Sequence, residues 1–317
     1  MPGIGVVTNP RSKANRRDPA GMKRLAYLLG TRGEAQATGS LDDLYRVAEQ
    51  FKAAGIDVLG IHGGDGTLHV TLTAFVKVYG ETPLPRIAIL GGGTLNTIAR
   101  GLQIRGAPQS ILYQVIEQYH QGLEMKTLER PIMRIGDQYG FIFGNGLIAN
   151  FLEAYYATGR PSPTTGALLL VRAAASALVR GRFARQLARR LRARVQVDGK
   201  PWTWDDYCTV TCGTVPEIGI GFRPYARCME SVQHFAYVGF HCQPNDIVWE
   251  LPRIYRGETV RASRAESGLA REMIIESEEE TKYIIDGDLH TQPPGPLAVS
   301  LGPTLQIIVP EGELDLR

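Results

Sequence analysis

The chain has 317 residues, 44% hydrophobic and 21% charged, which is the composition of an ordinary globular protein long enough for two cores. Its formal net charge of +3 excludes a polycation built to bind nucleic acid. The longest apolar stretch, Ala167 to Val179, is interrupted by Arg172 and is shorter than the ~20 residues that span a bilayer, so we expect only peripheral membrane contact.

Strand and helix patterns alternate along the N-terminal third of the chain. Strands are predicted at Gly3–Pro10, Ile56–His62 and Arg86–Leu90, and helices after Asp18, from Ser40 to Gly55, over Thr67–Tyr79 and over Asn96–Leu102. This alternation predicts an α/β fold in which helices cover both faces of a parallel sheet.

After about Thr127 the pattern changes to short strands separated by Gly-Asp and Asp-Gly turns. We therefore predict a second, mainly antiparallel β domain, interrupted by one long helix from Thr165 to about Arg192.

The four cysteines form no Cys-x-x-Cys pair, and no secretory leader precedes them. Reduced thiols in a cytoplasmic protein are expected, rather than disulfides or a metal site.

Two glycine-rich loops each follow a predicted strand and precede a predicted helix. The first is Gly63-Gly64-Asp65-Gly66-Thr67, and the second is Gly91-Gly92-Gly93-Thr94. Glycine lets backbone amides approach a phosphate, and ligands bind at the carboxyl edge of a parallel sheet. Together the loops predict a nucleoside triphosphate site, although each loop alone is equally compatible with a tight turn.

Neither loop contains the Gly-Lys-Ser/Thr of a Walker A motif or the Gly-x-Gly-x-x-Gly spacing of dinucleotide redox sites. Asp65 would repel triphosphate oxygens unless a cation lay between them, which implies Mg²⁺. Because Mg²⁺ keeps several waters and takes one or two protein carboxylates, a single aspartate is adequate.

The first loop, the sequence GGTLNTIAR at Gly92 to Arg100, Asn9-Pro10 and the DGD at Asp286 to Asp288 resemble the diacylglycerol kinase catalytic family, which includes bacterial lipid kinases and the sphingosine and ceramide kinases. The resemblance covers nearly the whole chain. It implies an ATP-binding domain like that of NAD kinases and phosphofructokinases at residues 1–127 and a β-rich lipid-substrate domain at 128–295. Residues 296–317 are expected to return to the first domain.

Three positions depart from the family pattern. Thr97 replaces an aspartate found in many members, and Asp288 replaces a glutamate. Met229, Glu230 and Ser231 stand where the family tends to have Asp-Asp-Gly near a structural Mg²⁺, so the resemblance does not carry that metal over to this chain.

The resemblance also implies catalytic roles. Asp286 would be the general base for the lipid hydroxyl, and Asp288 would assist through Mg²⁺ or by orienting Asp286. In the sphingosine kinase branch the loop aspartate, here Asp65, has a catalytic role, so the base stays open between Asp286 and Asp65. Without the family, Asp286-Gly287 indicates a hairpin turn. The expected nucleotide contacts are Asn9, Gly63, Gly64, Asp65, Gly66, Thr67, Gly92, Gly93, Thr94 and Asn96, and the expected Mg²⁺ ligands are Asp65 and Asp288.

Seven arginines lie between Arg180 and Arg194, with Phe183, Leu187 and Leu191 at helical spacing. Such a helix fits an anionic membrane surface, and it equally fits packing on the β domain with its basic face in water. Nucleic-acid binding is not expected, because no aromatic stacking surface accompanies the arginines.

The sequence thus predicts an ATP- and Mg²⁺-dependent lipid kinase that phosphorylates a hydroxyl of a diacylglycerol- or sphingoid-like lipid. It is expected to be cytoplasmic, with peripheral contact at the inner membrane surface. The alternatives are an NAD kinase and a catalytically silent nucleotide-binding regulator, the latter suggested by the altered Met229–Ser231 segment. An exposed β edge would allow a homodimer.

Overall fold

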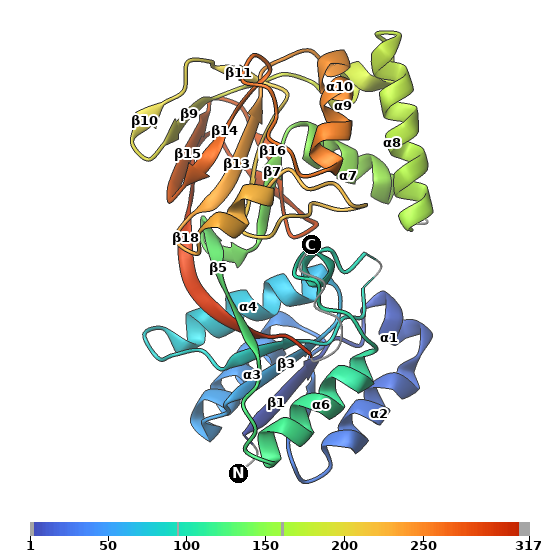
Figure 1. Ribbon diagram of the computed structural model, residues 1–317, viewed down its shortest axis with the longest axis vertical. Helices are drawn as coiled ribbons and strands as arrows, with labels where there is room; N and C mark the ends of the chain where they lie inside the picture. Colours follow the sequence, from blue (N-terminus) through green and yellow to red (C-terminus); the bar gives the residue numbers. More distant parts are fainter. Residues whose placement is uncertain (1–2, 94, 160–161, 311–317) are drawn as a thin grey trace. The chain divides into compact units, whose positions relative to one another are not determined.

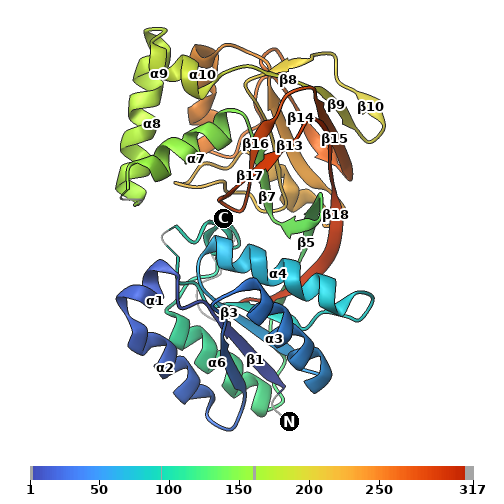
Figure 2. The same ribbon diagram turned by 180° about the vertical axis from the view of Figure 1, so that it is seen from behind.

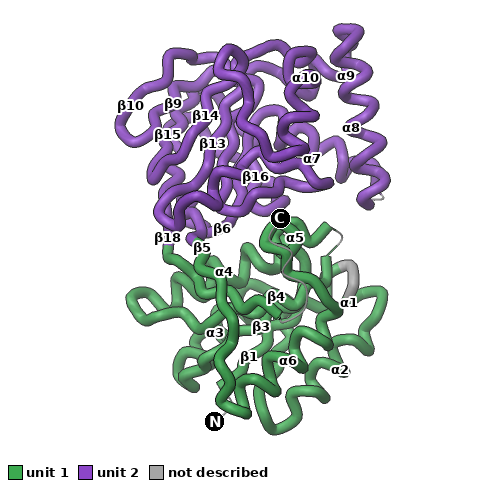
Figure 3. Tube along the Cα trace, viewed as in Figure 1, with its two compact units in different colours: residues 1–130, 303–317 green, residues 131–302 purple. Residues whose placement is uncertain are grey.

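The computed structural model describes residues 3–93, 95–159 and 162–310, and the chain forms two compact units (Figure 3). Unit 1 comprises residues 1–130 and 303–317, and unit 2 comprises residues 131–302. Two strands run from one unit into the other, β5 (Thr127–Ile135) and β18 (Gly295–Ile308). The predicted fold class is confirmed, since a mainly parallel sheet forms unit 1 and antiparallel sheets form unit 2.

Unit 1 is built on a parallel sheet in the order β18-β4-β3-β1-β2, to which β18 contributes its C-terminal half. The other strands are β1 (Ile4–Thr8), β2 (Glu34–Ala37), β3 (Val58–His62) and β4 (Arg86–Ile89). Strands β1 and β3 are buried along their whole length, as expected for a sheet covered on both faces.

Helices cover both faces of this sheet, with α3 and α4 on one face and α2 and α6 on the other (Figures 1 and 2). The helices are α1 (Lys13–Arg17), α2 (Pro19–Leu29), α3 (Leu41–Ala54), α4 (Asp65–Tyr79), α5 (Thr97–Gly101) and α6 (Pro108–His120). The capping predictions hold for α3, where Ser40 Oγ accepts the Asp43 amide at 3.1 Å and Gly55 ends the helix with φ 65°.

Unit 2 contains a six-stranded antiparallel sheet, β14-β13-β12-β7-β16-β17, and a second sheet, β10-β9-β15-β18, which uses the N-terminal half of β18. Their strands are β7 (Ile142–Asn145), β9 (Arg194–Val197), β10 (Lys200–Pro201), β12 (Thr209–Gly213), β13 (Phe235–Phe240), β14 (Ala265–Ala270), β15 (Glu272–Ser277), β16 (Thr281–Ile285) and β17 (Asp288–Gln292). Two short pairings complete the unit, β6 (Gln138–Gly140) with β5 and β8 (Leu191–Arg192) with β11 (Asp206–Tyr207).

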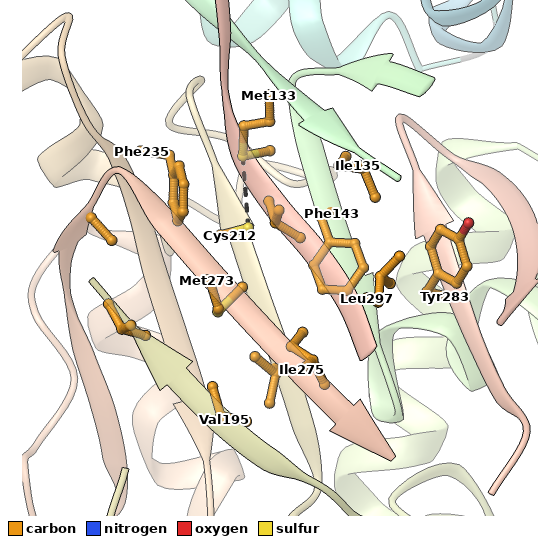
Figure 4. Close-up of a cluster of buried hydrophobic side chains, with 14 of the residues drawn as sticks. Met133, Ile135, Phe143, Val195, Cys212, Phe235, Met273, Ile275, Tyr283 and Leu297 are labelled. Carbon is orange, nitrogen blue, oxygen red and sulfur yellow. Dashed lines mark hydrogen bonds between the residues drawn. The ribbon is translucent and has the colours of Figure 1, made fainter. Parts of the chain in front are cut away.

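The main core of unit 2 lies between its two sheets (Figure 4). Phe143 of β7, Cys212 of β12 and Phe235 of β13 pack with Met273 and Ile275 of β15. All five side chains are buried, so this core holds β7 in place. Strand β16 of the β16–β17 hairpin pairs with β7.

Helices α7 (Leu147–Ala157), α8 (Pro163–Leu178), α9 (Arg182–Leu187), α10 (Pro244–Tyr255) and the 3₁₀ turn η1 (Ala226–Glu230) complete unit 2. On the outer face of the six-stranded sheet, Val238 and Phe240 of β13 pack against Ile247 and Ile254 of α10. In the part of the chain that the structure describes, no helix has the length and apolarity that a bilayer crossing requires.

The prediction of one long helix from Thr165 to about Arg192 is wrong. Arg180 adopts φ 52°, and the following Gly181 amide bonds to the Ser176 carbonyl at 2.7 Å, so the chain reverses after α8. Leu187 is buried at the end of α9, and Leu191 belongs to β8. The apolar stripe expected at Phe183, Leu187 and Leu191 therefore does not exist.

Candidate active site

The first glycine loop connects β3 to α4. A Cβ atom at Gly63 would lie 2.4 Å from the Thr67 side chain, which folds back over the loop. Thr67 Oγ1 accepts a hydrogen bond from Asn9 Nδ2 at 2.9 Å. The backbone amide of Asn9 donates to the His62 carbonyl at 3.2 Å. Asn9, at the end of β1, is thus fixed to the loop that follows the neighbouring strand.

The second glycine loop follows β4 and has a backbone that favours glycine. Gly91 has φ 59° and Gly92 has φ 147°. Asn96, itself at φ 47°, accepts the Gly93 amide at 2.8 Å through Oδ1. The Gly93 amide therefore points into its own loop, and Asn96 shapes the loop. Thr94, the remaining predicted contact here, lies outside the described residues.

The two loops touch backbone to backbone at the carboxyl edge of the parallel sheet. A Cβ atom at Gly93 would lie 2.6 Å from the Cα of Gly64, and one at Gly64 would lie 3.0 Å from the Cα of Gly93. A side chain at either position would force the loops apart. The glycines therefore let the two loops meet at one place, as expected for loops that follow neighbouring parallel strands.

Asp65 connects the two loops by hydrogen bonds. Its Oδ2 accepts the Thr97 amide at 2.9 Å and its Oδ1 accepts the Ile98 amide at 3.1 Å, so it caps the N-terminus of α5 from the first turn of α4. A carboxylate at these two helix N-termini is also favoured by their dipoles. Asp65 therefore has a structural role besides any contact with a ligand.

Replacing Asp65 by asparagine should lower the free energy of unfolding by about 1–2 kcal/mol, because an amide NH₂ would face the Thr97 or Ile98 amide. Urea unfolding measures this. Asp42→Asn is the matched control, since Asp42 is exposed in the first turn of α3. If Asp65→Asn unfolded at the same urea concentration as the wild type, the proposed connection between the loops would be wrong.

His62 ends β3 beneath the second loop, with Nε2 3.3 Å from the position of a Cβ on Gly92. The side chain is buried, and within the described residues Nδ1 has no hydrogen-bond partner. Burial lowers the pKa of His62 to about 4 from 6.5, so the imidazole is neutral at neutral pH.

Stability should fall on acidification because of His62. Its folded-state pKa is depressed, so between pH 6.5 and pH 4 the unfolded state binds more protons. Through His62, acidification from pH 7 to pH 5 should lower the free energy of unfolding by about 2 kcal/mol. In His62→Gln the decrease in the free energy of unfolding over this pH range should be smaller by about 2 kcal/mol. Urea unfolding at both pH values measures the difference. The control is His120→Gln, at an exposed histidine, which should show the same decrease in the free energy of unfolding as the wild type. If His62→Gln also showed the wild-type decrease, the depressed pKa of His62 would not be its cause.

The second group of predicted residues lies in unit 2, on the β16–β17 hairpin. Ile285 pairs with Asp288, so Asp286 and Gly287 form the two-residue turn, with φ 48° and 92° as in a type I′ turn. The turn that the residues alone indicate is therefore present. Asp288 starts β17 and is half-buried.

The Asp286 carboxylate is buried and accepts two backbone amides. Its Oδ1 lies 2.9 Å from the Phe141 nitrogen and 2.8 Å from the Ile142 nitrogen, and Oδ2 lies 3.1 Å from the Phe141 nitrogen. These bonds fix the orientation of the carboxylate at the start of β7.

Two residues that support Asp286 were not predicted. A Cβ atom at Gly140 would lie 3.0 Å from Asp286 Oδ2 and 2.3 Å from the Ile285 side chain. Tyr156 of α7 donates its hydroxyl to the Gly287 carbonyl at 2.9 Å. Gly140 is the last residue of β6, where an isolated glycine can signal a close approach of side chains. No sequence pattern marks Tyr156.

Near η1, Arg227 donates to both oxygens of Glu230, at 3.1 and 3.2 Å. The one carboxylate in the altered Met229–Ser231 segment is therefore paired with an arginine. Among the described residues, no group of three or more His, Cys, Asp or Glu side chains forms a metal cluster.

The arginines between Arg180 and Arg194 do not form one face. Arg190 donates to Asp206 Oδ1 at 2.8 Å and to the carbonyls of His241 and Cys242 at 2.9 and 3.0 Å, so it joins strands within unit 2. Exposed Arg182 and Arg185 lie on α9.

Comparison with known proteins finds a match in the part of the chain that carries the two loops. Residues 3–128, which contain both glycine loops, match the model of the diacylglycerol kinase catalytic domain. The likeness to that catalytic domain thus lies in the N-terminal part of the chain, which forms most of unit 1. No curated protein is similar enough to match it.

Solved structures extend the likeness over both units. A diacylglycerol kinase from Bacillus anthracis str. Sterne is 15% identical, with a TM-score of 0.65, and a putative diacylglycerol kinase from the same strain is 16% identical, with a TM-score of 0.70. Each alignment covers 97% of this chain and 97% of the other. At such low identity the likeness shows that the fold is shared.

Proposed function

We propose that this protein is an ATP-dependent lipid kinase that phosphorylates a hydroxyl of a diacylglycerol- or sphingoid-like lipid. The observation that carries the proposal is the backbone contact between Gly64 and Gly93, where a Cβ atom would come within 3.0 Å of the facing loop. This contact occurs within the segment that matches the family's catalytic domain.

The first loop suits the phosphates of ATP. Gly64 is the N-cap of α4 and has no side chain to cap the first-turn amides. Such amides have no partner within their helix, and an anion can accept their hydrogen bonds. The residues we propose for contact with the nucleotide are Asn9, Gly63, Gly64, Asp65, Gly66, Thr67, Gly92, Gly93, Thr94 and Asn96.

Asp65 fits a hydrated Mg²⁺. Its oxygens accept the Thr97 and Ile98 amides, so the carboxylate is held in place at the starts of α4 and α5, beside both glycine loops. Mg²⁺ commonly takes one or two protein carboxylates and keeps several waters. We assign Asp65 as one ligand and Asp288 as a second. When bound, the metal would neutralise charge on the phosphates.

Asp286 is the proposed general base. Phosphoryl transfer needs mainly alignment, and a carboxylate fixed in one orientation can direct the acceptor hydroxyl and take its proton late in the reaction. The amides of Phe141 and Ile142 provide that fixed orientation. Asp65, already bonded to two amides of α5, is the competing candidate.

A lipid-extract screen tests the proposal and identifies the acceptor. The protein, ATP and Mg²⁺ are incubated with fractionated lipids, and the products are analysed by mass spectrometry for the mass of one added phosphoryl group. We expect a phosphorylated lipid with a free hydroxyl in the parent molecule. Consumption of ATP without any phosphorylated lipid would count against the proposal.

A further inference from the structure

Helix α8 has an apolar face that no described residue of unit 2 covers. It lies at the outer edge of the unit, with α7 and α10 on its inner side (Figures 1 and 2). Its inner face carries Gly166, Leu169 and Ala177, which are buried. The opposite face is exposed over its whole length, although surface helices normally place polar residues there.

The exposed face consists of large aliphatic side chains at helical spacing. Leu168, Val171 and Leu178 are 72%, 64% and 52% exposed, and Ala175 lies between the last two. Val179, the C-cap, is 78% exposed. Positions 168, 171, 175 and 178 recur every three or four residues, so they form one continuous ridge. Contiguous exposed apolar surface of this kind marks a membrane or protein contact.

Arginines surround the C-terminal end of this ridge. Arg172 lies at its edge, 4.4 Å from the Phe183 ring of α9, and Arg180, Arg182 and Arg185 are exposed in the turn and on α9. Ala184 of α9 donates its amide to Ser176 Oγ at 3.0 Å, so the two helices are fixed to one another. The arginines therefore stay beside the apolar ridge.

No acidic residue occurs between Ala154 and Val197 to neutralise these charges. The same segment contains the arginines 160, 172, 180, 182, 185, 189, 190, 192 and 194. Arg190 is engaged within unit 2, and Arg189 makes an exposed contact with Glu279 at 3.8 Å. The ridge and its rim are thus apolar and cationic, the two properties of a helix that lies in an anionic lipid interface.

We propose that the ridge of Leu168, Val171, Ala175, Leu178 and Val179, with Arg172, Arg180, Arg182 and Arg185, docks unit 2 on an anionic phospholipid bilayer. The aliphatic side chains enter the boundary between headgroups and acyl chains, and the guanidinium groups bind lipid phosphates. A second copy of the chain is a poorer partner, because the same face on that copy would present no carboxylate to these arginines.

Binding to vesicles tests this surface. Wild-type protein is sedimented with vesicles of phosphatidylcholine alone or of phosphatidylcholine and phosphatidylserine in equal parts, without ATP. We expect at least roughly tenfold tighter binding to the anionic vesicles. Neither lipid is the acceptor proposed above, so the result does not depend on the kinase assignment.

Two sets of variants separate the apolar and cationic contributions. Leu168→Ser/Val171→Ser/Leu178→Ser should weaken binding to anionic vesicles by roughly tenfold or more. Its control is Leu41→Ser/Tyr113→Ser/Leu123→Ser, three residues of unit 1 that are 59%, 54% and 54% exposed. Arg182→Gln/Arg185→Gln should remove most of the preference for anionic vesicles, while exposed Lys23→Gln/Lys200→Gln should keep it. All replaced side chains are exposed, and circular dichroism checks that each variant is folded.

Three results would overturn the proposal: wild-type protein that does not prefer anionic vesicles, a triple serine variant of α8 that binds as well as the wild type, or a glutamine variant that keeps the full preference. If the serine variant instead converted a dimer to a monomer in sedimentation velocity and left vesicle binding unchanged, the ridge would be an interface between copies.

Discussion

Replacing Asp286 by asparagine is expected to lower the rate of lipid phosphorylation by about a thousandfold, because a positioned general base contributes roughly 10²–10⁴-fold. The asparagine Oδ1 can still accept the amides of Phe141 and Ile142, so the hairpin should remain folded. Affinity for ATP should stay within about twofold of the wild type, since the nucleotide contacts that we propose lie in unit 1. Initial rates and calorimetric titration with ATP measure the two quantities.

Asp137→Asn is the control for this variant, because Asp137 is also a turn aspartate of unit 2 but is exposed. It should retain full activity. Near-normal activity in Asp286→Asn, together with a large loss in Asp65→Asn at intact ATP affinity, would assign the base to Asp65. A silent nucleotide-binding regulator would show no turnover in any of these proteins.

Replacing Gly93 by alanine is expected to weaken ATP binding by more than about tenfold and to lower the free energy of unfolding by roughly 1–3 kcal/mol. The added Cβ would lie 2.6 Å from the Cα of Gly64 and 2.8 Å from Asn96 Oδ1. Backbone cannot move aside as a flexible side chain can, so the two loops must separate. Calorimetric titration with ATP and urea unfolding measure the two effects.

Gly39→Ala controls for the loss of a glycine in unit 1, because the nearest atom to a Cβ at Gly39 is 3.8 Å away. This variant should bind ATP as the wild type does. Wild-type ATP affinity in Gly93→Ala would mean that the contact between the loops does not form the nucleotide site.

Features encoded in short sequence segments could be predicted. The glycine loops could be predicted because each lies between a strand pattern and a helix pattern. The ends of α3 could be predicted from Ser40 and Gly55. The Asp286-Gly287 turn followed from a common hairpin pair. In each case the residues that determine the conformation are neighbours in the chain.

Features that depend on distant residues could not be predicted. Asp65 bonds to amides 32 and 33 residues further on, and Asp286 to amides about 145 residues before it. Strand β2 is Glu-Ala-Gln-Ala, which contains no β-branched or aromatic residue and is held by pairing with β1. Helix α10 contains Pro252, which argues locally against a helix.

The α8–α9 region shows how one backbone conformation changes a prediction. The residue pattern from Thr165 to Arg192 suits a single helix, but Arg180 adopts a left-handed conformation that no pattern indicates. The exposed apolar surface was predicted at positions 183, 187 and 191. In the structure it lies at positions 168, 171, 175 and 178 on α8.

The most direct test of the central claim is the transfer of label from ATP. The protein is incubated with Mg²⁺, γ-³²P-labelled ATP and either NAD or mixed micelles that contain diacylglycerol and sphingosine. A lipid kinase places the label in the lipid fraction and leaves NAD unlabelled. Label in NAD alone, or ATP that stays intact in the presence of every acceptor, would contradict the account.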